Sequence, residues 1–487
     1  MNKPIRTMSI VCMALFVALL VNSTYLQYLQ ADELNSRNDN KRVRDAEFSR
    51  ERGAILVAGN SVAQSKPSND QFEFQRVYSQ PEKYAHLTGY YSYTYGRNAV
   101  ELTQNDILSG SDPRLFVNRV VDLFGNSQPK GGDVSLTIDP KAQNAAYDGL
   151  QALGKDVKGS VVALDPSTGA IQAMVSNPSY DPSGLSSHNL STISSSWEKL
   201  TGDPDRPMLN RGIQEVLPPG STFKLVTAAA ALSSGQYDPD SLVPGGARLD
   251  LPQTDTDLPN ESGTDCGGDK VTLTQALMVS CNVSFGYLGL TLGDDALREQ
   301  AEAFGFGDEY LDDLNGQVAS RFPEDPDAPQ SALSAIGQFD VAATPLQMAM
   351  VSAGIANGGT VMKPYLVDEV RSPDLDVLDK AEPEPYRNAV SSSVARDLTQ
   401  MMVEVVDQGT GSTAQIPGMK VAGKTGTAQS EADRPPYAWF VSFAPADDPE
   451  VAVAVLIEDA GVARDAISGS GLAAPIAKRV MEAVINQ

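Results

Sequence analysis

An apolar run close to the N-terminus decides in which compartment the rest of this chain must fold. Residues 8–21 (MSIVCMALFVALLV) carry no charge, Lys3 and Arg6 precede them, and only uncharged polar residues interrupt the run up to Leu29. Extended that far, the segment reaches the roughly 20 residues that cross a bilayer. Basic residues before the run favour a cytoplasmic N-terminus. We therefore expect a single-pass anchor in the cell membrane, with everything after residue 30 outside the membrane.

The same segment could instead be a cleaved signal peptide. Signal peptides end in a small-x-small site, and the nearest candidates, residues 21–23 and 29–31, fit that pattern poorly. We expect the anchor to stay uncleaved, and on either interpretation the bulk of the chain is exported.

Composition narrows the functions open to the exported part. The 487 residues are too many for one ordinary domain, and 41% hydrophobic with 20% charged residues is a globular balance. The 37 basic and 62 acidic residues give a net charge of −25, which repels phosphate backbones and argues against a nucleic-acid partner. Only two histidines, His86 and His188, and three cysteines are present. We expect no metal site, no cofactor, and a catalytic base other than histidine.

Pattern divides the chain into three parts. We predict a cytoplasmic tip and anchor at 1–30, a stalk and small β-rich pedestal domain at 31–130, and a larger domain at 131–487. In that last part we predict a strand at 133–139, a helix at 141–153, a β-hairpin at 160–176, helices through 221–357, a loop at 372–386, strands at 438–443 and 451–457, and a helix at 472–485. Strands early and late, with helices between, indicate an α+β domain whose two ends share one sheet.

The first candidate for chemistry is Ser221-x-x-Lys224, after the turn Pro218-Pro219-Gly220. Tandem prolines cannot lie inside a helix, so the apolar run that follows should begin a helix near Gly220 or Ser221. The i to i+3 spacing then places Ser221 and Lys224 on one helix face. A lysine in apolar surroundings near another cation can be neutral and accept the serine proton, and a helix N-terminus can stabilise an oxyanion.

This motif alone is a weak signal, because S-x-x-K also occurs at 127–130 and 196–199. The first of these lies among glycine and proline, and the second lacks an apolar helix behind it. Neither offers the same setting for an activated serine.

Two further motifs make the assignment specific. Ser280-x-Asn282 lies between two helical patterns, and Lys424-Thr-Gly-Thr427 leads towards a strand-like segment. The spacing is 59 residues from Ser221 to Ser280 and 144 more to Lys424. Order and spacing match the S-x-x-K, S-x-N and K-T-G set of penicillin-interacting serine enzymes.

With these motifs the chain resembles the class B penicillin-binding proteins, and within them the PbpA type of actinobacteria, over nearly its whole length. Further segments that carry the resemblance are 52–55 (RGAI), 136–139 (LTID), 165–182, 209–224, 337–350 and 437–445. The resemblance implies a serine β-lactamase/transpeptidase-like domain, an antiparallel sheet flanked by helices, behind a pedestal similar to a dimerisation domain. GQFDVAAT stands where class B enzymes commonly have Gly-Gln-Gly, which favours this subgroup.

The resemblance also implies an activity. Such a protein is a peptidoglycan D,D-transpeptidase that cross-links stem peptides ending in D-Ala-D-Ala through a serine acyl-enzyme, and β-lactams acylate it. About 100 residues separate the anchor from Gly131, too few for a glycosyltransferase domain. Glycan polymerisation would therefore come from a partner, a SEDS-type polymerase of the RodA sort.

The same resemblance assigns the site residues. They are the catalytic Ser221, Lys224, Ser280, Asn282 and Lys424 and the substrate-binding Thr425, Gly426 and Thr427. Ser221 would be the nucleophile and Lys224 its general base. The Ser-x-Asn pair would relay protons and hold the peptide amide, and the K-T-G-T segment would bind the substrate carboxylate. The backbone N–H groups of Ser221 and Thr427 would form the oxyanion hole.

Three other functions remain as alternatives. A D,D-carboxypeptidase would use the same groups. Class A β-lactamases position their deacylating water with a Glu-x-x-x-Asn pair, which we do not expect between Asn282 and Lys424, and a secreted hydrolase needs no stalk or pedestal. A penicillin sensor or inert scaffold has no need for Lys224 together with Lys424.

Cys266 and Cys281 are the cysteines outside the apolar segment, and an exported chain meets oxidants. We predict that they form a disulfide, which would tie a Gly- and Asp-rich loop to the middle residue of Ser280-x-Asn282. The alternative is two separate small buried side chains, as cysteines often are.

Overall fold

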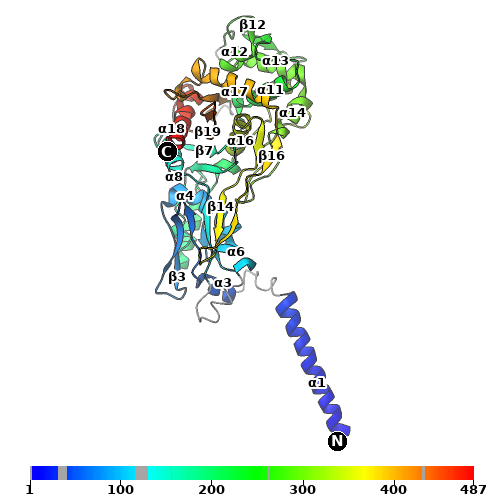
Figure 1. Ribbon diagram of the computed structural model, residues 1–487, viewed down its shortest axis with the longest axis vertical. Coiled ribbons are helices and arrows are strands. Elements are labelled where there is room, and N and C mark those ends of the chain that lie inside the picture. The colour runs from blue at the N-terminus through cyan, green and yellow to red at the C-terminus, as the bar shows by residue number, and fades with distance from the viewer. Residues whose placement is uncertain are drawn as a thin grey trace.

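One apolar helix lies apart from a β-rich middle part and a larger mixed part (Figure 1). The computed structural model describes residues 3–30, 41–115, 130–154, 156–261, 263–429 and 434–486. Helix α1 (Lys3–Thr24) continues in a π-helical turn (Tyr25–Leu29), and neither element has a buried residue. At about 1.5 Å per residue the 27-residue segment is long enough to cross the hydrocarbon core of a membrane. This fits the predicted anchor.

A five-stranded antiparallel sheet forms the centre of the larger part, within the described residues. Its order is β17-β18-β19-β7-β8, so the last strands of the chain pair with an early hairpin. The strands are β7 (Lys158–Leu164), β8 (Ile171–Asn177), β17 (Ala422–Ala428), β18 (Tyr437–Ala444) and β19 (Val451–Asp459). The predicted hairpin and the predicted meeting of the two chain ends in one sheet are confirmed.

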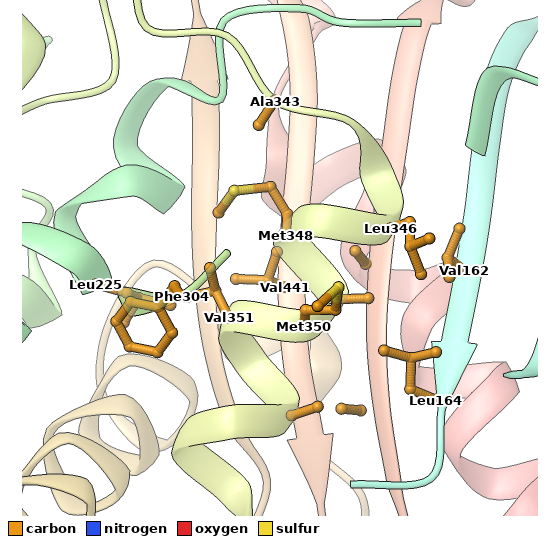
Figure 2. Close-up of a cluster of buried hydrophobic side chains, with 14 of the residues drawn as sticks. Val162, Leu164, Leu225, Phe304, Ala343, Leu346, Met348, Met350, Val351 and Val441 are labelled. Carbon is orange, nitrogen blue, oxygen red and sulfur yellow. The ribbon is translucent and has the colours of Figure 1, made fainter. Parts of the chain in front are cut away.

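Helices cover both faces of this sheet. Every residue of β18 is buried, because alternate side chains of a strand enter opposite cores. Trp439 and Val441 lie in the core beneath α16 (Pro345–Ala356), whereas Phe440 packs with α8 (Pro140–Gln151) and α18 (Ala474–Ile485). Figure 2 shows α16 lying across the strands, with Leu346 and Met350 next to Val162 and Leu164 of β7. The predicted helices at the two ends of the domain therefore cover one face of the sheet together, and α16 covers the other.

The remaining elements of the larger part form a mainly helical region beside the sheet, together with the segments that connect this region to the strands. They are η3 (Pro182–Gly184), α9 (Leu190–Thr201), α10 (Arg211–Gln214), η4 (Gly220–Phe223), α11 (Lys224–Ser233), α12 (Leu273–Met278), α13 (Asn282–Leu292), α14 (Asp294–Ala303), α15 (Ala328–Ser334), α17 (Ser392–Asp407), η5 (Ser412–Ala414), η6 (Arg464–Ala466) and η7 (Gly469–Ala473). Short strand pairs join β9 (Leu242–Pro244) to β12 (Lys270–Thr272), β10 (Arg248–Asp250) to β11 (Asp257–Pro259), and β13 (Thr360–Met362) to β16 (Pro385–Asn388). Helices do dominate residues 221–357, but these small strands interrupt them.

The middle part is built on a second sheet, of six strands within the described residues. Its order is β15-β14-β6-β1-β2-β3, with β1 (Ile55–Val57), β2 (Asn60–Pro67), β3 (Phe74–Tyr78), β6 (Asp133–Leu136), β14 (Val367–Arg371) and β15 (Val377–Lys380). Around it lie α3 (Lys41–Phe48), α4 (Pro81–Thr88), β4 (Tyr91–Ser92), β5 (Gly96–Arg97), α5 (Ala99–Thr103), α6 (Asn105–Leu108) and η2 (Pro113–Leu115).

The predicted loop at 372–386 is wrong, because β15 lies within it and β16 begins there. The cause is a long-range pairing of residues 367–371 with 133–136, which local pattern does not reveal.

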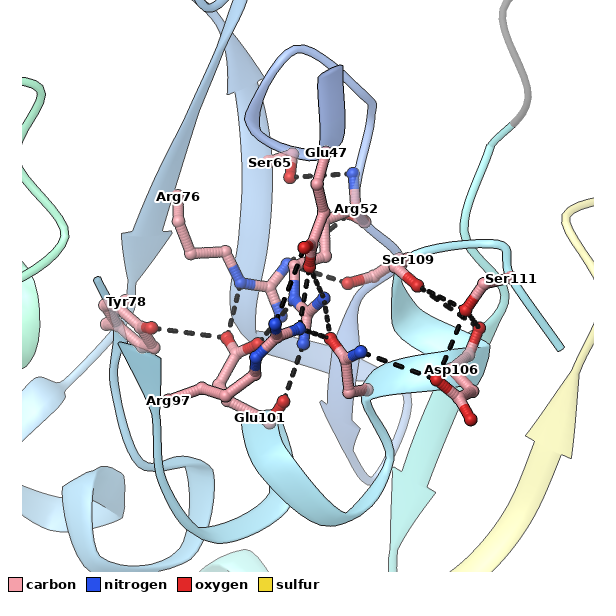
Figure 3. A network of polar contacts seen from close by, with 12 residues as sticks. Glu47, Arg52, Ser65, Arg76, Tyr78, Arg97, Glu101, Asp106, Ser109 and Ser111 are labelled. Atoms are coloured by element: carbon pink, nitrogen blue, oxygen red, sulfur yellow. Dashed lines mark hydrogen bonds and ion pairs between the residues drawn. The ribbon is translucent and has the colours of Figure 1, made fainter. Parts of the chain in front are cut away.

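A buried ion network fastens this second sheet to the helices beside it (Figure 3). Arg52 and Arg76 each donate through Nε to the carboxylate of Glu101 at 2.6 Å, and all three side chains are almost fully buried. Burial by itself raises the pKa of Glu101, but Arg76 and Arg52 hold it below its usual value. Gly53 follows directly, where a Cβ would stand 1.9 Å from the carbonyl oxygen of Gly132, so only glycine allows the two segments to cross.

Candidate active site

A cleft of about 670 Å³ opens between the helical part and the edge strand β17. Ser221, Ser280, Thr425 and Thr427 all line it, so the structure brings together residues from all three sequence motifs. Lys224 and Lys424 lie buried beneath these groups and bond to Ser280. The cleft is the site at which the predicted residues converge.

Ser221 lies in the 3-10 turn η4, directly before helix α11. The turn is fixed from below, because the Trp439 indole N–H donates to the carbonyl of Pro218 at 2.9 Å. Gly220 has φ +53°, a left-handed conformation, and its N–H donates to Gly337. The predicted helix start near Gly220 or Ser221 is confirmed, with one 3-10 turn before the α-helix.

Lys224 is fully buried, and its ammonium nitrogen bonds to the neighbouring motif. Nζ donates to the Ser280 carbonyl and to Asn282 Oδ1, each at 2.7 Å, and to Ser280 Oγ at 3.3 Å. Burial, together with the nearby charge of Lys424, lowers the pKa of Lys224 well below its usual value. Within the described residues no hydrogen bond joins Lys224 to Ser221, although both belong to the same turn of helix.

Ser280 connects the two lysines. Its Oγ accepts from Lys224 and also from Lys424 Nζ, at 2.9 Å. Ser280 has φ +61°, a left-handed conformation that a residue with a side chain seldom adopts. The strained backbone holds the hydroxyl between the two lysine side chains, where it can pass a proton from one group to the next.

Strand β17 carries the K-T-G-T residues along the edge of the sheet, with β18 as its only strand neighbour among the described elements. Burial lowers the pKa of Lys424 to about 7. Thr425 Oγ1 lies 2.7 Å from Thr410 Oγ1, and a Cβ on Gly426 would stand 3.0 Å from the Pro219 carbonyl oxygen. Hydroxyls, a cation and an open strand edge suit an extended peptide with a terminal carboxylate.

The predicted disulfide is confirmed. Cys266 and Cys281 are bonded, with Cα atoms 5.9 Å apart. The bond ties the loop around Cys266 to the middle residue of the Ser280-x-Asn282 motif. Both cysteines also line the cleft, so the cross-link forms part of its wall.

The S-x-x-K segment at 196–199 takes no part in the cleft. Ser196 and Lys199 lie on α9, and neither lines the cleft. In the 127–130 match, Ser127 lies outside the described residues. The described parts of the chain contain no group of three His, Cys, Asp or Glu side chains that could hold a metal ion.

The expectation about a Glu-x-x-x-Asn pair needs correction. That spacing does occur between Asn282 and Lys424, at Glu384 and Asn388. The pair lies at β16, where Asn388 Oδ1 accepts from Thr360 and the Glu384 carbonyl accepts from Lys363, and neither residue lines the cleft. The β-lactamase alternative is therefore weakened by the position of this pair, not by its absence.

Sequence reasoning missed several residues of the cleft. Thr410, Glu261 and Gly469 all line it, and none belongs to a motif. Of these three, only Gly469 gives a signal in the sequence, as part of the small-residue run SGSG at 468–471. The structure explains why glycine is needed there, since a Cβ would stand 2.2 Å from the Trp439 carbonyl oxygen. Thr410 and Glu261 reach the site through the fold alone.

Comparison with known proteins decides the family. The model of the penicillin binding protein transpeptidase domain matches residues 159–482, and that of the penicillin binding protein A dimerisation domain matches residues 52–134. The chain belongs to the penicillin-binding protein transpeptidase family. The chain is 44% identical to peptidoglycan D,D-transpeptidase PbpA of Mycolicibacterium smegmatis, covering 100% of both chains.

Solved structures of penicillin-binding protein A from M. tuberculosis share the fold. The ceftriaxone acyl-enzyme complex has a TM-score of 0.86 at 44% identity, covering 91% of this chain and 100% of the other. The penicillin G acyl-enzyme complex has a TM-score of 0.84 at 43% identity, covering 89% and 99%. The α+β transpeptidase fold with its pedestal and N-terminal apolar helix is thereby confirmed.

Proposed function

We propose that this chain is a peptidoglycan D,D-transpeptidase that works through a serine acyl-enzyme and is acylated by β-lactams. The observation that carries the proposal is the Lys224–Ser280–Lys424 arrangement in the cleft that Ser221 lines. A relative of 44% identity bears that activity in its name, and a similar protein of known structure forms β-lactam acyl-enzymes.

The acylation step needs a base next to the nucleophile. Neutral Lys224 takes the Ser221 hydroxyl proton as Oγ attacks the carbonyl carbon of the D-Ala-D-Ala bond, and the backbone N–H groups of Ser221 and Thr427 hold the oxyanion. When the C–N bond breaks, the leaving amine takes the proton through Ser280. The short bonds of Lys224 to Asn282 and Ser280 support this relay, since they keep Nζ inside the cleft.

Substrate binding falls to the edge strand. Cationic Lys424 and the hydroxyls of Thr425 and Thr427 bind the donor carboxylate, and Gly426 lets the peptide backbone approach β17. Asn282 holds the peptide amide with its side chain. The open edge of β17 supports this assignment, because an extended peptide can add to it as a further strand.

The same reasoning extends to the cell. Lys3 and Arg6 support a cytoplasmic N-terminus, with a single span at 1–30, a stalk and pedestal at 31–130, and the transpeptidase domain at 131–487 outside the membrane. With no room for a glycosyltransferase domain between anchor and cleft, we assign glycan polymerisation to a SEDS-type partner. Co-purification of the full-length chain with such a polymerase, lost on deletion of residues 1–30, tests this partner.

Labelling with a fluorescent penicillin tests the function. We expect one labelled peptide, containing Ser221, and an adduct that persists for many minutes. Ser221→Ala should abolish labelling, whereas Ser196→Ala, the matched serine of the unused S-x-x-K segment, should leave it intact. Label on another serine would refute the nucleophile, and release of the adduct within seconds would favour a β-lactamase.

A further inference from the structure

Part of the cleft wall comes from Asn260, Glu261, Asp265 and Cys266, and several bonds anchor this part of the chain. The Asn260 side chain donates to the carbonyls of Gly246 and Thr264 and accepts from the N–H of Val283, at 3.0, 2.8 and 3.1 Å. Six residues further on, the disulfide of Cys266 fastens the loop again. Glu261 and Asp265, which lie between these two anchor points, are thus held at the wall of the cleft.

Glu261 lies directly after the first anchor point and lines the cleft together with Ser221. No described residue forms an ion pair with its carboxylate, and its negative charge only partly offsets the lowering of the Lys224 and Lys424 pKa values that burial causes. The cleft is therefore polarised, with Lys424 and the strand edge on one side and the carboxylates of Glu261 and Asp265 on the other. Asp265 already accepts a hydrogen bond from the N–H of Gly267, which leaves Glu261 as the carboxylate without a bond of this kind among the described residues.

The second half of the proposed reaction needs a group that fits this polarity. Once Ser221 is acylated, the donor has lost its terminal D-alanine, and an acceptor amine must approach the ester. Primary amines of side-chain type are protonated at neutral pH, with pKa values near 10. The cationic Lys424 repels such an ammonium group, so the acceptor needs an anionic partner elsewhere in the cleft.

We propose that Glu261 is the specificity residue that binds the ammonium group of the acceptor and places it before the Ser221 ester. The inference rests on the proposed function. The bound ammonium gives one proton to water, and the free amine attacks the ester carbon. As the C–N bond forms and the C–O bond breaks, the second proton passes from nitrogen to Ser221 Oγ. Ester and ammonium ion thus yield amide, serine and one released proton.

Competition between transfer and hydrolysis tests this role in the full-length protein. The donor is a thioester analogue of the D-Ala-D-Ala peptide. The acceptors are Nα-acetyl-lysine amide and its 6-hydroxy analogue, which has the same length and no charge. For Glu261→Gln we expect the amine concentration that gives half-maximal transfer to rise about tenfold, the size of a lost hydrogen bond to a charged group. Half-saturation by the alcohol should not change.

Three controls sharpen the result. Asp255→Asn removes the same charge from the same exposed segment outside the cleft and should change neither value. Glu261→Asp keeps the charge and should recover part of the amine affinity. Rising salt should weaken amine transfer in the wild type and not in Glu261→Gln, because only the former depends on charge attraction.

Two results would overturn the inference. An equal shift for amine and alcohol would mean that Glu261 acts only through the lysines, and a selective loss of hydrolysis without acceptor would make it the base for a deacylating water. Mass analysis of the acyl-enzyme in the same samples separates these results from a failure of the proposed function, since that failure leaves Ser221 without an acyl group.

Discussion

The cleft and the pedestal both bury charged side chains, but they use them in opposite ways. In the pedestal, Arg52 and Arg76 enclose Glu101, so opposite charges meet and the carboxylate stays ionised. In the cleft, Lys224 and Lys424 share one hydroxyl, and burial lowers the pKa of both. Opposite charges at hydrogen-bond distance keep both groups ionised and stabilise the structure. Two cationic groups in a buried site have lowered pKa values, so that one of them can be neutral and accept a proton.

Replacing a cleft lysine by a permanent cation should have the largest effect. Lys224→Arg keeps the positive charge and removes the ability to lose a proton. We expect penicillin acylation to slow by between about a hundredfold and ten-thousandfold, the usual contribution of general base catalysis. Stopped-flow acylation measures this, with Lys199→Arg on α9 as the control. A rate near that of the wild type would refute the base role.

Removing the central charge of the pedestal should affect folding and not chemistry. Glu101→Gln leaves Arg52 and Arg76 without their anion, and we expect a loss of about 3–5 kcal/mol in the free energy of unfolding. Denaturant unfolding measures the loss, and acylation of the folded fraction should stay at the wild-type rate. If the acylation rate falls while the free energy of unfolding stays unchanged, Glu101 affects the chemistry of the cleft, and the contrast between the two regions is refuted.

Acid should act first on the pedestal side. Burial lowers the pKa of His86 from 6.5 to about 4, while the hydrogen bond to Pro207 opposes the shift. Between pH 6.5 and about 4, His86 therefore binds a proton more readily in the unfolded chain than in the folded one. Stability is complete above pH 6.5 and falls by about 3 kcal/mol as the pH drops to 4. Thermal melting of wild type and His86→Gln across this range should show a flatter profile for the variant.

The smallest effect is expected at the edge of the cleft. Thr410→Val removes the hydroxyl 2.7 Å from Thr425 Oγ1 and keeps the shape of the side chain. Loss of one neutral hydrogen bond is worth about 1 kcal/mol, so we expect donor KM to rise about fivefold with kcat unchanged. Steady-state turnover of a peptide donor measures the split. A lower kcat at constant KM would place Thr410 in the reaction step instead.

Sequence patterns within a few residues correctly predicted the structures that depend on neighbouring residues alone. The proline turn set the helix start before Lys224, and the Asp165–Gly169 turn set the hairpin of β7 and β8. Motif order then located the cleft. The bonding partners of Lys224 did not follow from its spacing to Ser221, because they lie 56 to 58 residues away, at the start of α13 and just before it.

Contacts between residues far apart in the sequence could not be predicted from these local patterns. The acidic, proline-rich segment at 372–386 has the composition of a loop, yet part of it is a strand because β14 and β6 hold it there. Glu261 is likewise an ordinary exposed acid in the sequence. The disulfide and the Asn260 bonds hold its part of the chain at the cleft that Ser221 also lines.

The late arrival of β14 and β15 has a consequence for how the protein is made. The pedestal sheet contains β1, β2, β3 and β6, which are complete by residue 136, but its last two strands come from residues 367–380. A nascent chain therefore leaves one edge of β6 unpaired until residues 367–371 have been synthesised. Completion of this sheet is thus tied to the synthesis of residues 367–380, which belong to the larger domain, and a product truncated before them cannot complete it.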